Sequence, residues 1–409
     1  MMRNDAQKII DSAIAAALPG TAVKKALEGE TFPGGRLLLT AIGKAAWSMA
    51  EAACGALGDR ISGGVVITKY GHSRGSLGHI RIYEAGHPVP DDNSFTAAEE
   101  VIKLVTGLKP EDTVLFLVSG GGSALFEKPL VSKVILENLT KQLLASGADI
   151  VEINTIRKKL SAVKGGKFAK LCEPARVFSI ILSDIIGDPL DMIASGPAYP
   201  DSSTGRQARD ILGKYGIAAP PEVMDLFDIE PVTALSNVTT KITGSVTQLC
   251  EAAGKTCGEL GYKPVILTAS LRCQAREAGS FLSSIAQYHK NTDVPLAFIA
   301  GGETVVYLKG NGKGGRNQEL ALAAAEGISG IDGAAVFSIG SDGTDGPTDA
   351  AGGYVDGATK TILAAKGINI FETLENNDAY NALKTCGGLI ITGPTGTNVN
   401  DLSVLLIRG

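Results

Sequence analysis

The sequence has few aromatic residues, few histidines and no ordered pattern of cysteines. Aromatic residues make up 5% of the 409 residues, with a single tryptophan. The six cysteines include no Cys-x-x-Cys pair and form no cluster with the four histidines. No histidine stands near a serine or cysteine in a way that suggests a catalytic triad. We therefore expect free thiols in a reducing cytosol, and neither a disulfide framework nor a Cys/His metal cluster.

The sequence also lacks long apolar runs and an excess of positive charge. No apolar run approaches the roughly 18 residues of a membrane span. Lysine and arginine total 38 against 43 acidic residues, a net charge of −5, which argues against nucleic acid or an anionic membrane as main partner. Asp11 interrupts the apolar part of the N-terminal segment, which therefore predicts an amphipathic helix over 5–18 and not a signal peptide. We expect a soluble cytoplasmic protein.

The length and the periodicity predict two α/β domains. A chain of 409 residues exceeds the size at which one core keeps growing. Helical and strand-like patterns alternate in both halves, and the pattern stops between residues 214 and 232. We predict a Rossmann-like domain over 1–232 and a second α/β domain over 233–409, each a mostly parallel sheet flanked by helices. In the second half, 295–302 and 304–310 look like paired strands.

A glycine turn follows the strand-like run 114–118 and precedes a predicted helix start. Strand, glycine turn and helix N-terminus together make an anion cradle, because free backbone N–H groups and the positive end of the helix dipole converge there. The lysine of a Walker A loop is absent. The turn is either a simple connection or a site for a phosphate or a substrate carboxylate. Its residues are Ser119, Gly120, Gly121, Gly122 and Ser123.

Lys44 comes directly after Gly43, at the end of the predicted strand 36–43 and the start of a helix. A lysine is poorly placed at a helix N-terminus, because the dipole there is positive. The stability of the helix therefore gives no reason for a lysine at this position. Lys44 is either an exposed, solvated side chain or the cation that the glycine turn lacks.

Three aspartates follow the apolar run 177–182 in the segment LSDIIGDPLDMIASGP. Asp184 and Asp188 are placed at a strand end, where carboxylates can hold Mg²⁺ through one or two oxygens and waters. One of them could instead take a proton from a substrate hydroxyl. Asp188 also precedes a proline, which suits a helix N-cap.

The segment GNGKGGRNQEL contains a formal G-x-G-x-x-G over 310–315, which is a weak dinucleotide signature without an acidic residue at the expected distance. Lys313 and Arg316 beside these glycines suit contacts to phosphates, as a point charge and a planar fork. A further loop carries Asp342, Asp345 and Asp349. It is either a metal or ligand site or a turn stabilised by side-chain to backbone hydrogen bonds.

Taken together, the motifs resemble the glycerate 2-kinase family, whose C-terminal part is the MOFRL domain. The resemblance runs in family order from about residue 40 to 402. It implies ATP-dependent phosphorylation of D-glycerate at the 2-hydroxyl, giving 2-phosphoglycerate, with Mg²⁺. It also implies two α/β domains with the active site in a cleft between them. The motifs are AGHPVPDDNS, VSGGGSALF, NTIRKKLSAVKGGK, LSDIIGDPLDMIASGP, GGETVVYLKGNGKGGRNQELAL, GSDGTDGPTDAAGG and TGPTGTNVND.

The resemblance carries over two residues, since Lys44 and Arg316 match positively charged active-site positions of such kinases. Our own assignment adds Lys313 and Asn317 to the glycine turn as contacts to anionic groups. It places Mg²⁺ on Asp184 or Asp188, with the other aspartate positioning or deprotonating the hydroxyl. Two alternatives stay open: an NAD(P)H-dependent hydroxypyruvate reductase, a name that members have often carried, and a non-catalytic sensor of hydroxy acids or sugar phosphates. A homo-oligomer is compatible with the sequence.

Overall fold

The computed structural model describes residues 2–32, 34–183, 185–187 and 189–408. Asp184 and Asp188 fall outside these ranges. By its internal contacts the chain divides into two compact units, which confirms the two-domain α/β class. Of the described residues, unit 1 comprises those within 1–21, 184–187 and 244–409, and unit 2 comprises those within 22–183 and 188–243.

Unit 2 contains a six-stranded sheet in which every pair of neighbours is parallel, in the order β3-β2-β1-β4-β5-β6. All residues of the two central strands β1 and β4 are buried, as continuous apolar runs in a sheet covered on both faces should be. This is the strand order of a doubly wound sheet, where ligands bind at the carboxyl ends of the strands beside the point at which the order reverses. The strands are β1 (Leu37–Ile42), β2 (Ile61–Lys69), β3 (Ile80–Ala85), β4 (Thr113–Val118), β5 (Arg176–Leu182) and β6 (Val238–Thr243).

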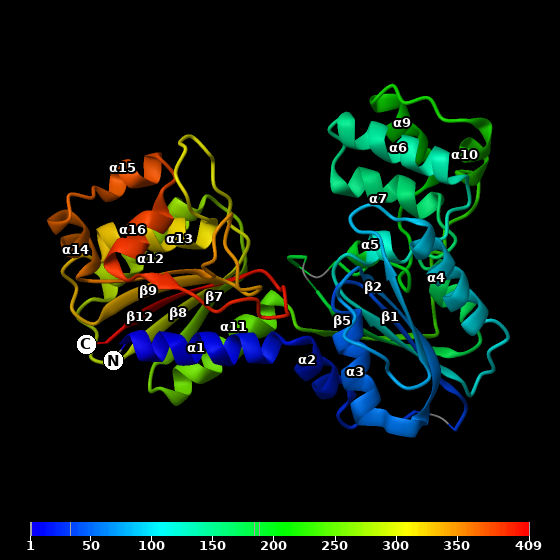
Figure 1. Cartoon of the computed structure of the whole chain (residues 1–409), viewed down its shortest axis with the longest axis horizontal. Helices are drawn as coiled ribbons and strands as arrows, with labels where there is room; N and C mark the ends of the chain where they lie inside the picture. The colour runs from blue at the N-terminus through cyan, green and yellow to red at the C-terminus, as the bar shows by residue number, and fades with distance from the viewer. Residues whose placement is uncertain (1, 33, 184, 188, 409) are drawn as a thin grey trace. The chain divides into compact units, whose positions relative to one another are not determined.

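The helices of unit 2 include a group that builds a core of its own, separate from the sheet. Helices α6, α7, α9 and α10 gather on one side of the unit (Figure 1), and their leucines and isoleucines pack together with Phe227. The helices are α2 (Pro19–Leu27), α3 (Ala46–Leu57), α4 (Asp92–Leu104), α5 (Gly122–Leu125), α6 (Lys133–Ala145), α7 (Ile150–Lys159), α8 (Lys167–Leu171), α9 (Gly205–Lys214) and α10 (Pro221–Leu226), with short 3-10 turns η1 (Gly58–Arg60) and η2 (Ile193–Ser195).

Unit 1 contains a mixed sheet in the order β11-β10-β9-β12-β8-β7. It differs from the mostly parallel sheet that the alternating pattern predicts, because the last strand of the chain enters its middle. Strand β12 runs antiparallel to both β8 and β9, and only β7 and β8 pair in parallel. The strands are β7 (Lys263–Leu271), β8 (Leu296–Gly302), β9 (Ala334–Gly340), β10 (Gly352–Asp356), β11 (Leu389–Ile390) and β12 (Asp401–Ile407).

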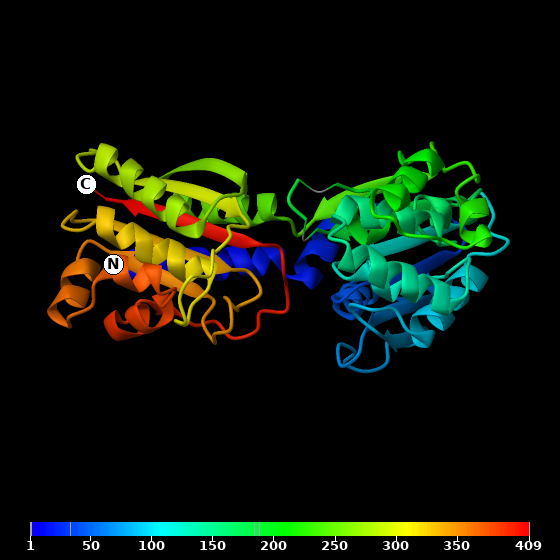
Figure 2. The same cartoon turned by 90° about the horizontal axis from the view of Figure 1, so that it is seen from above.

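Helices cover both faces of this mixed sheet. Helices α1 and α11 pack against each other on one face, while α12 and α13 lie on the other (Figures 1 and 2). None of the described helices combines the length and the hydropathy that a membrane span requires. The helices are α1 (Met2–Ala17), α11 (Val246–Glu259), α12 (Ala275–His289), α13 (Arg316–Gly327), α14 (Thr359–Ala365), α15 (Ile370–Glu375) and α16 (Ala379–Cys386).

The predicted strand over 304–310 is wrong, because this segment forms a loop. The backbone N–H groups of Lys309 and Gly310 donate to the side-chain oxygen of Asn377, at 2.8 and 3.0 Å. The N–H of Gly312 donates to the carbonyl of Asn376 at 2.9 Å. These acceptors replace a partner strand, and β8 is already paired on both edges by β7 and β12.

An aromatic cluster beneath the glycine turn gives a test of the core of unit 2. The ring centroid of Phe168 lies 4.6 Å from that of Phe116 and 5.4 Å from that of Phe126, and all three side chains are fully buried. Phe168→Ala should therefore lower the free energy of unfolding by about 3–5 kcal/mol. Chemical denaturation followed by the fluorescence of Trp47, which lies in unit 2, measures this. Val134→Ala, at a 75% exposed position, should change it by less than about 0.5 kcal/mol; equal effects of the two would contradict the packing.

Candidate functional sites in the two units

Hydrogen bonds join the ends of β1 and β4, where the strand order of unit 2 reverses. The N–H of Ser119 donates to the carbonyl of Ile42 at 3.0 Å, and the N–H of Lys44 donates to the carbonyl of Gly120 at 2.9 Å. The hydroxyl of Ser119 accepts from the N–H of Ala45 at 3.0 Å. Lys44 and the glycine turn, predicted separately from the sequence, are thus held side by side. Lys44 is exposed, and no described carboxylate pairs with its ammonium group.

The glycine turn presents unpaired backbone donors. Gly121 has a φ of +85° and caps the short helix α5. Within the described part of the chain, no protein acceptor receives the N–H groups of Gly120, Gly121, Gly122 or Ser123. Four adjacent N–H groups without acceptors, next to a lysine, form a surface that suits an anion.

Three polar residues behind the turn were missed by the sequence analysis. The hydroxyl of Ser123 lies 2.9 Å from that of Ser195, which donates to the side-chain oxygen of Asn154 at 3.0 Å. A guanidinium N–H of Arg157 donates to the carbonyl of Ser123 at 3.1 Å. Ser195 has a φ of +62°, a conformation that a serine adopts only under constraint. All three lie within the motifs NTIRKKLSAVKGGK and LSDIIGDPLDMIASGP, which carry the family resemblance, but the sequence does not show that these residues meet at the turn.

The basic segment 154–172 is largely buried, which its charge did not predict. Lys158 and Lys159 are both 4% exposed and pair with Asp201, at 3.6 and 3.1 Å. Lys158 also reaches Asp191, the third aspartate of the 182–197 segment, at 3.2 Å. These ion pairs connect helix α7 to the loops that carry Asp191 and Asp201. Separating the pairs is costly, because it would leave a buried charge without a partner.

Lys164 is a further buried cation of this segment. Its side chain is fully buried and pairs with Glu127 at 2.8 Å. Burial lowers the pKa of Lys164 to about 8, although the charge of Glu127 acts in the opposite direction. The ammonium also donates to the carbonyl of Phe126 at 2.8 Å, so it supports the end of helix α5.

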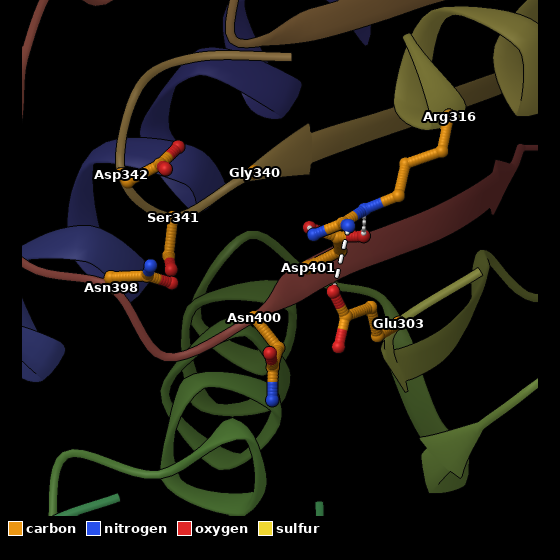
Figure 3. A pocket seen from close by; sticks show the side chains of 8 residues that line it. All are labelled: Glu303, Arg316, Gly340, Ser341, Asp342, Asn398, Asn400 and Asp401. Atoms are coloured by element: carbon orange, nitrogen blue, oxygen red, sulfur yellow. Dashed lines mark hydrogen bonds and ion pairs between the residues drawn. The ribbon is translucent and has the colours of Figure 1, made fainter. Parts of the chain in front are cut away.

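In unit 1, Arg316 lines a polar pocket of about 210 Å³. Its guanidinium makes a two-pronged contact with Asp401, at 2.6 and 3.0 Å, and a third contact with Glu303 at 2.8 Å (Figure 3). Burial lowers the pKa of Arg316, but the bonds to Asp401 outweigh it and raise that pKa above its ordinary value. The pocket is lined by Glu303, Arg316, Gly340, Ser341, Asp342, Asn398, Asn400 and Asp401.

Asp345 caps helix α13, which begins at Arg316. Its two carboxylate oxygens accept the N–H groups of Asn317 and Gln318, at 3.1 and 2.9 Å. The other two aspartates of this loop also bond to protein groups. Asp342 accepts from the N–H of Thr344 at 2.9 Å, and Asp349 accepts from the hydroxyl of Tyr380 at 2.7 Å. Asp342 and Asp345 thus accept backbone N–H groups, as the turn interpretation predicts, whereas Asp349 bonds to a side chain. Asp342 also lines the pocket.

The other candidates near Arg316 have structural contacts. Asn317 is 1% exposed, and its side-chain oxygen accepts from the hydroxyl of Ser338 at 2.5 Å. Lys313 is exposed, with its ammonium 4.3 Å from the ring centroid of Tyr380. Neither lines the pocket of Arg316, and their assignment as phosphate contacts stays a prediction. So does the Mg²⁺ assignment, because Asp184 and Asp188 lie outside the described residues, among which no three acidic, histidine or cysteine side chains are grouped as a metal site.

Comparison with known proteins covers the whole chain. Residues 5–228 match the family described as a domain of unknown function (DUF4147), and residues 296–401 match the MOFRL family. The chain is 53% identical over 406 residues to D-glycerate 2-kinase of Thermotoga maritima, covering 98% of this chain and 97% of that protein. It is 41% identical over 428 residues to glycerate 2-kinase of Pyrococcus horikoshii, covering 98% and 96%. A crystal structure of a glycerate kinase from T. maritima matches with a TM-score of 0.95 at 52% identity, covering 100% of this chain and 99% of that one.

The burial of Asp345 makes a pH-dependent contribution to stability. Burial raises the pKa of this carboxyl to about 6, although the helix N–H groups act in the opposite direction. Because the folded pKa exceeds the unfolded value near 3.9, the contribution is full below about pH 4 and is lost as the pH rises through 6. Asp345→Asn should remove this decrease in the free energy of unfolding, which amounts to about 2–3 kcal/mol. Denaturation followed by circular dichroism between pH 4 and 7 measures it; parallel pH profiles for wild type and variant would contradict the assignment.

Proposed function

We propose, from the premise that this chain belongs to the glycerate 2-kinase family, that it transfers the γ-phosphoryl group of ATP to the 2-hydroxyl of D-glycerate. The products are 2-phosphoglycerate and ADP. The structural observation that carries the proposal is the glycine turn of unit 2, where four N–H groups without acceptors lie beside the ammonium-bearing side chain of Lys44. Both substrates of this reaction are anions, and such a turn binds anions.

The glycine turn is assigned to the carboxylate of glycerate. The turn fixes one end of a small substrate through backbone N–H groups, whose positions do not depend on side-chain rotamers. Lys44 adds the positive charge that the turn lacks and follows a strand whose position is fixed by the sheet. Binding of the carboxylate there holds the neighbouring 2-hydroxyl in place, and positioning is the main contribution of the protein to phosphoryl transfer.

Arg316 of unit 1 is assigned to the transferring phosphoryl group. Its Nε and Nη2 donate to Asp401 as a fork and its Nη1 donates to Glu303, which leaves one N–H on each of Nη1 and Nη2 for a phosphate oxygen. Asp401 is 5% exposed, so this fork is fixed within the unit. The further assignment of Lys313 and Asn317 to phosphate contacts remains part of the proposal.

Mg²⁺, when bound, would neutralise charge on the phosphates of ATP. Its proposed ligand is Asp184 or Asp188, since carboxylate oxygens are the ligands that this ion prefers. Strand β5 ends at Leu182, two residues before Asp184, and β5 pairs directly with β4, which leads into the glycine turn. The aspartate of the pair that does not hold the metal is the group proposed to position or deprotonate the 2-hydroxyl.

The structure gives the glycines of 310–315 a role that needs no dinucleotide. A Cβ atom at Gly310 would lie 2.4 Å from the Cα of Asn376, and one at Gly312 would lie 2.5 Å from the carbonyl oxygen of the same residue. The two glycines therefore let their loop pack against the end of α15. The glycine motif therefore gives no support to a nicotinamide-dependent reductase. Catalytic phosphorylation of glycerate would exclude the other alternative, a non-catalytic sensor.

The reaction is tested by incubating the protein with ATP, Mg²⁺ and D-glycerate and resolving the product as 2- or 3-phosphoglycerate. We expect 2-phosphoglycerate in amounts equal to ADP, and no NADH oxidation with hydroxypyruvate. A product phosphorylated at the 3-hydroxyl would contradict the position of transfer. Absence of any product in a folded sample that binds glycerate would favour the sensor.

Lys44→Ala tests the charge beside the turn. Loss of one group that stabilises developing charge typically lowers kcat about 100- to 1,000-fold, and we expect a loss of that size in steady-state assays. Lys141→Ala is the control, because Lys141 is an exposed lysine on α6 that belongs to no proposed site. A kcat of Lys44→Ala within a few-fold of the control would show that Lys44 has no role in transfer.

A further inference from the structure

The imidazole of His87 lies directly beside the glycine turn. A Cβ atom built on Gly121 would lie 3.0 Å from both Cδ2 and Nε2 of His87, and 3.2 Å from Cγ of Lys44. The imidazole of His87 and the aliphatic part of the Lys44 side chain therefore both lie beside Gly121. A side chain at position 121 would press against the imidazole, so the glycine allows the ring to lie close to the backbone of the turn.

His87 has no hydrogen-bond partner in the described chain, unlike two other histidines. His72 bonds through Nδ1 to the carbonyl of Lys44 at 3.0 Å, and His79 bonds through Nε2 to the carbonyl of Ile61 at 2.7 Å. The ring of His289 packs against that of Phe298. A half-buried imidazole with two free nitrogens, next to four free N–H groups, is therefore available to a ligand.

The loop that carries His87 is held by other residues. The carboxylate of Asp91 accepts from the hydroxyl of Tyr70 at 2.7 Å and from the N–H of Ser94 at 3.0 Å, and it also accepts from the N–H of Gly86. Asp91 thus bonds to a residue before His87 in the same loop, Gly86, and to Ser94 in helix α4, which it caps. The bond to the N–H of Gly86 holds the backbone directly before His87, while the imidazole itself has no hydrogen bond to the described chain.

We propose that Nε2 of His87 forms the hydrogen bond to the substrate hydroxyl that receives the phosphoryl group. This inference rests on the proposed function, which places the carboxylate of glycerate on the glycine turn. The 2-hydroxyl is carried by the carbon bonded to that carboxylate, so a group beside the carboxylate site is also beside the hydroxyl. His87 then selects 2-hydroxy acids and orients the hydroxyl oxygen for transfer.

The charge state of the ring is consistent with this role. Burial, followed by the positive charges of Lys44, Lys69 and His72, lowers the pKa of His87 below its ordinary value. The ring is therefore neutral at neutral pH, and a neutral imidazole can either accept from or donate to a hydroxyl. Which nitrogen carries the proton is left to the ligand, because no protein group fixes the tautomer.

The kinetic test compares His87→Ala and His87→Gln with His79→Ala, a histidine whose ring bonds only to a backbone carbonyl away from the turn. We expect His87→Ala to lower kcat about 100-fold, as misplacement of a reacting group does. KM should change much less, because the carboxylate contacts remain. His87→Gln, which keeps a hydrogen-bonding group, should recover part of the loss, and His79→Ala should behave as wild type. A kcat of His87→Ala within threefold of wild type would overturn the inference.

A binding test separates this inference from the proposed function. Calorimetry with D-lactate, which has the 2-hydroxyl, and with propionate, which differs from it only by lacking that hydroxyl, requires no turnover. Wild type should bind D-lactate more tightly by about 3- to 10-fold, the range for one hydrogen bond, and His87→Ala should bind both equally. An unchanged preference in His87→Ala would overturn the role of His87 even in an active enzyme. If wild type makes no phosphoglycerate but shows the predicted preference, the proposed reaction fails and the contact to the hydroxyl stands.

Discussion

The hydrogen bonds between the ends of β1 and β4 place Lys44 beside the glycine turn of unit 2. Parallel pairing brings Ile42 opposite Val118, so both strands end at the same level of the sheet. The two turns that follow are then joined by backbone bonds, which is possible only because residue 43 is a glycine: a Cβ there would lie 2.3 Å from the hydroxyl oxygen of Ser119. Lys44 is consequently placed by the backbone and not by contacts of its own side chain.

A second constraint is the set of buried ion pairs around this turn. Buried charges are expensive unless they are paired, so each pair fixes the segments that carry it. Lys164 joins Glu127, directly after helix α5, to the segment that precedes α8. Lys158 and Lys159 hold the two loops that carry Asp191 and Asp201. The segments around the glycine turn are therefore held together by buried ion pairs.

The sequence predicted the parts of the structure that depend on local patterns. The buried strands around β4, the glycine turn and the adjacent lysine all follow from apolar runs and turn residues within short segments. The sequence could not show that β12 returns to the middle of the second sheet, or that Asn377 replaces a partner strand for the loop at 309–310 from nearly 70 residues away. Ser195 and Asn154 were missed for the same reason, since only folding brings them to Ser123. Arg316 was found, but its fork with Asp401 was not.

The central claim is that the glycine turn with Lys44 is the site of the glycerate carboxylate, and a crystal structure with D-glycerate bound tests it most directly. The account predicts the carboxylate within hydrogen-bonding distance of the N–H groups of Gly121 and Gly122, with the 2-hydroxyl toward His87. Glycerate bound in the polar pocket of Arg316, with only water at the turn, would contradict it.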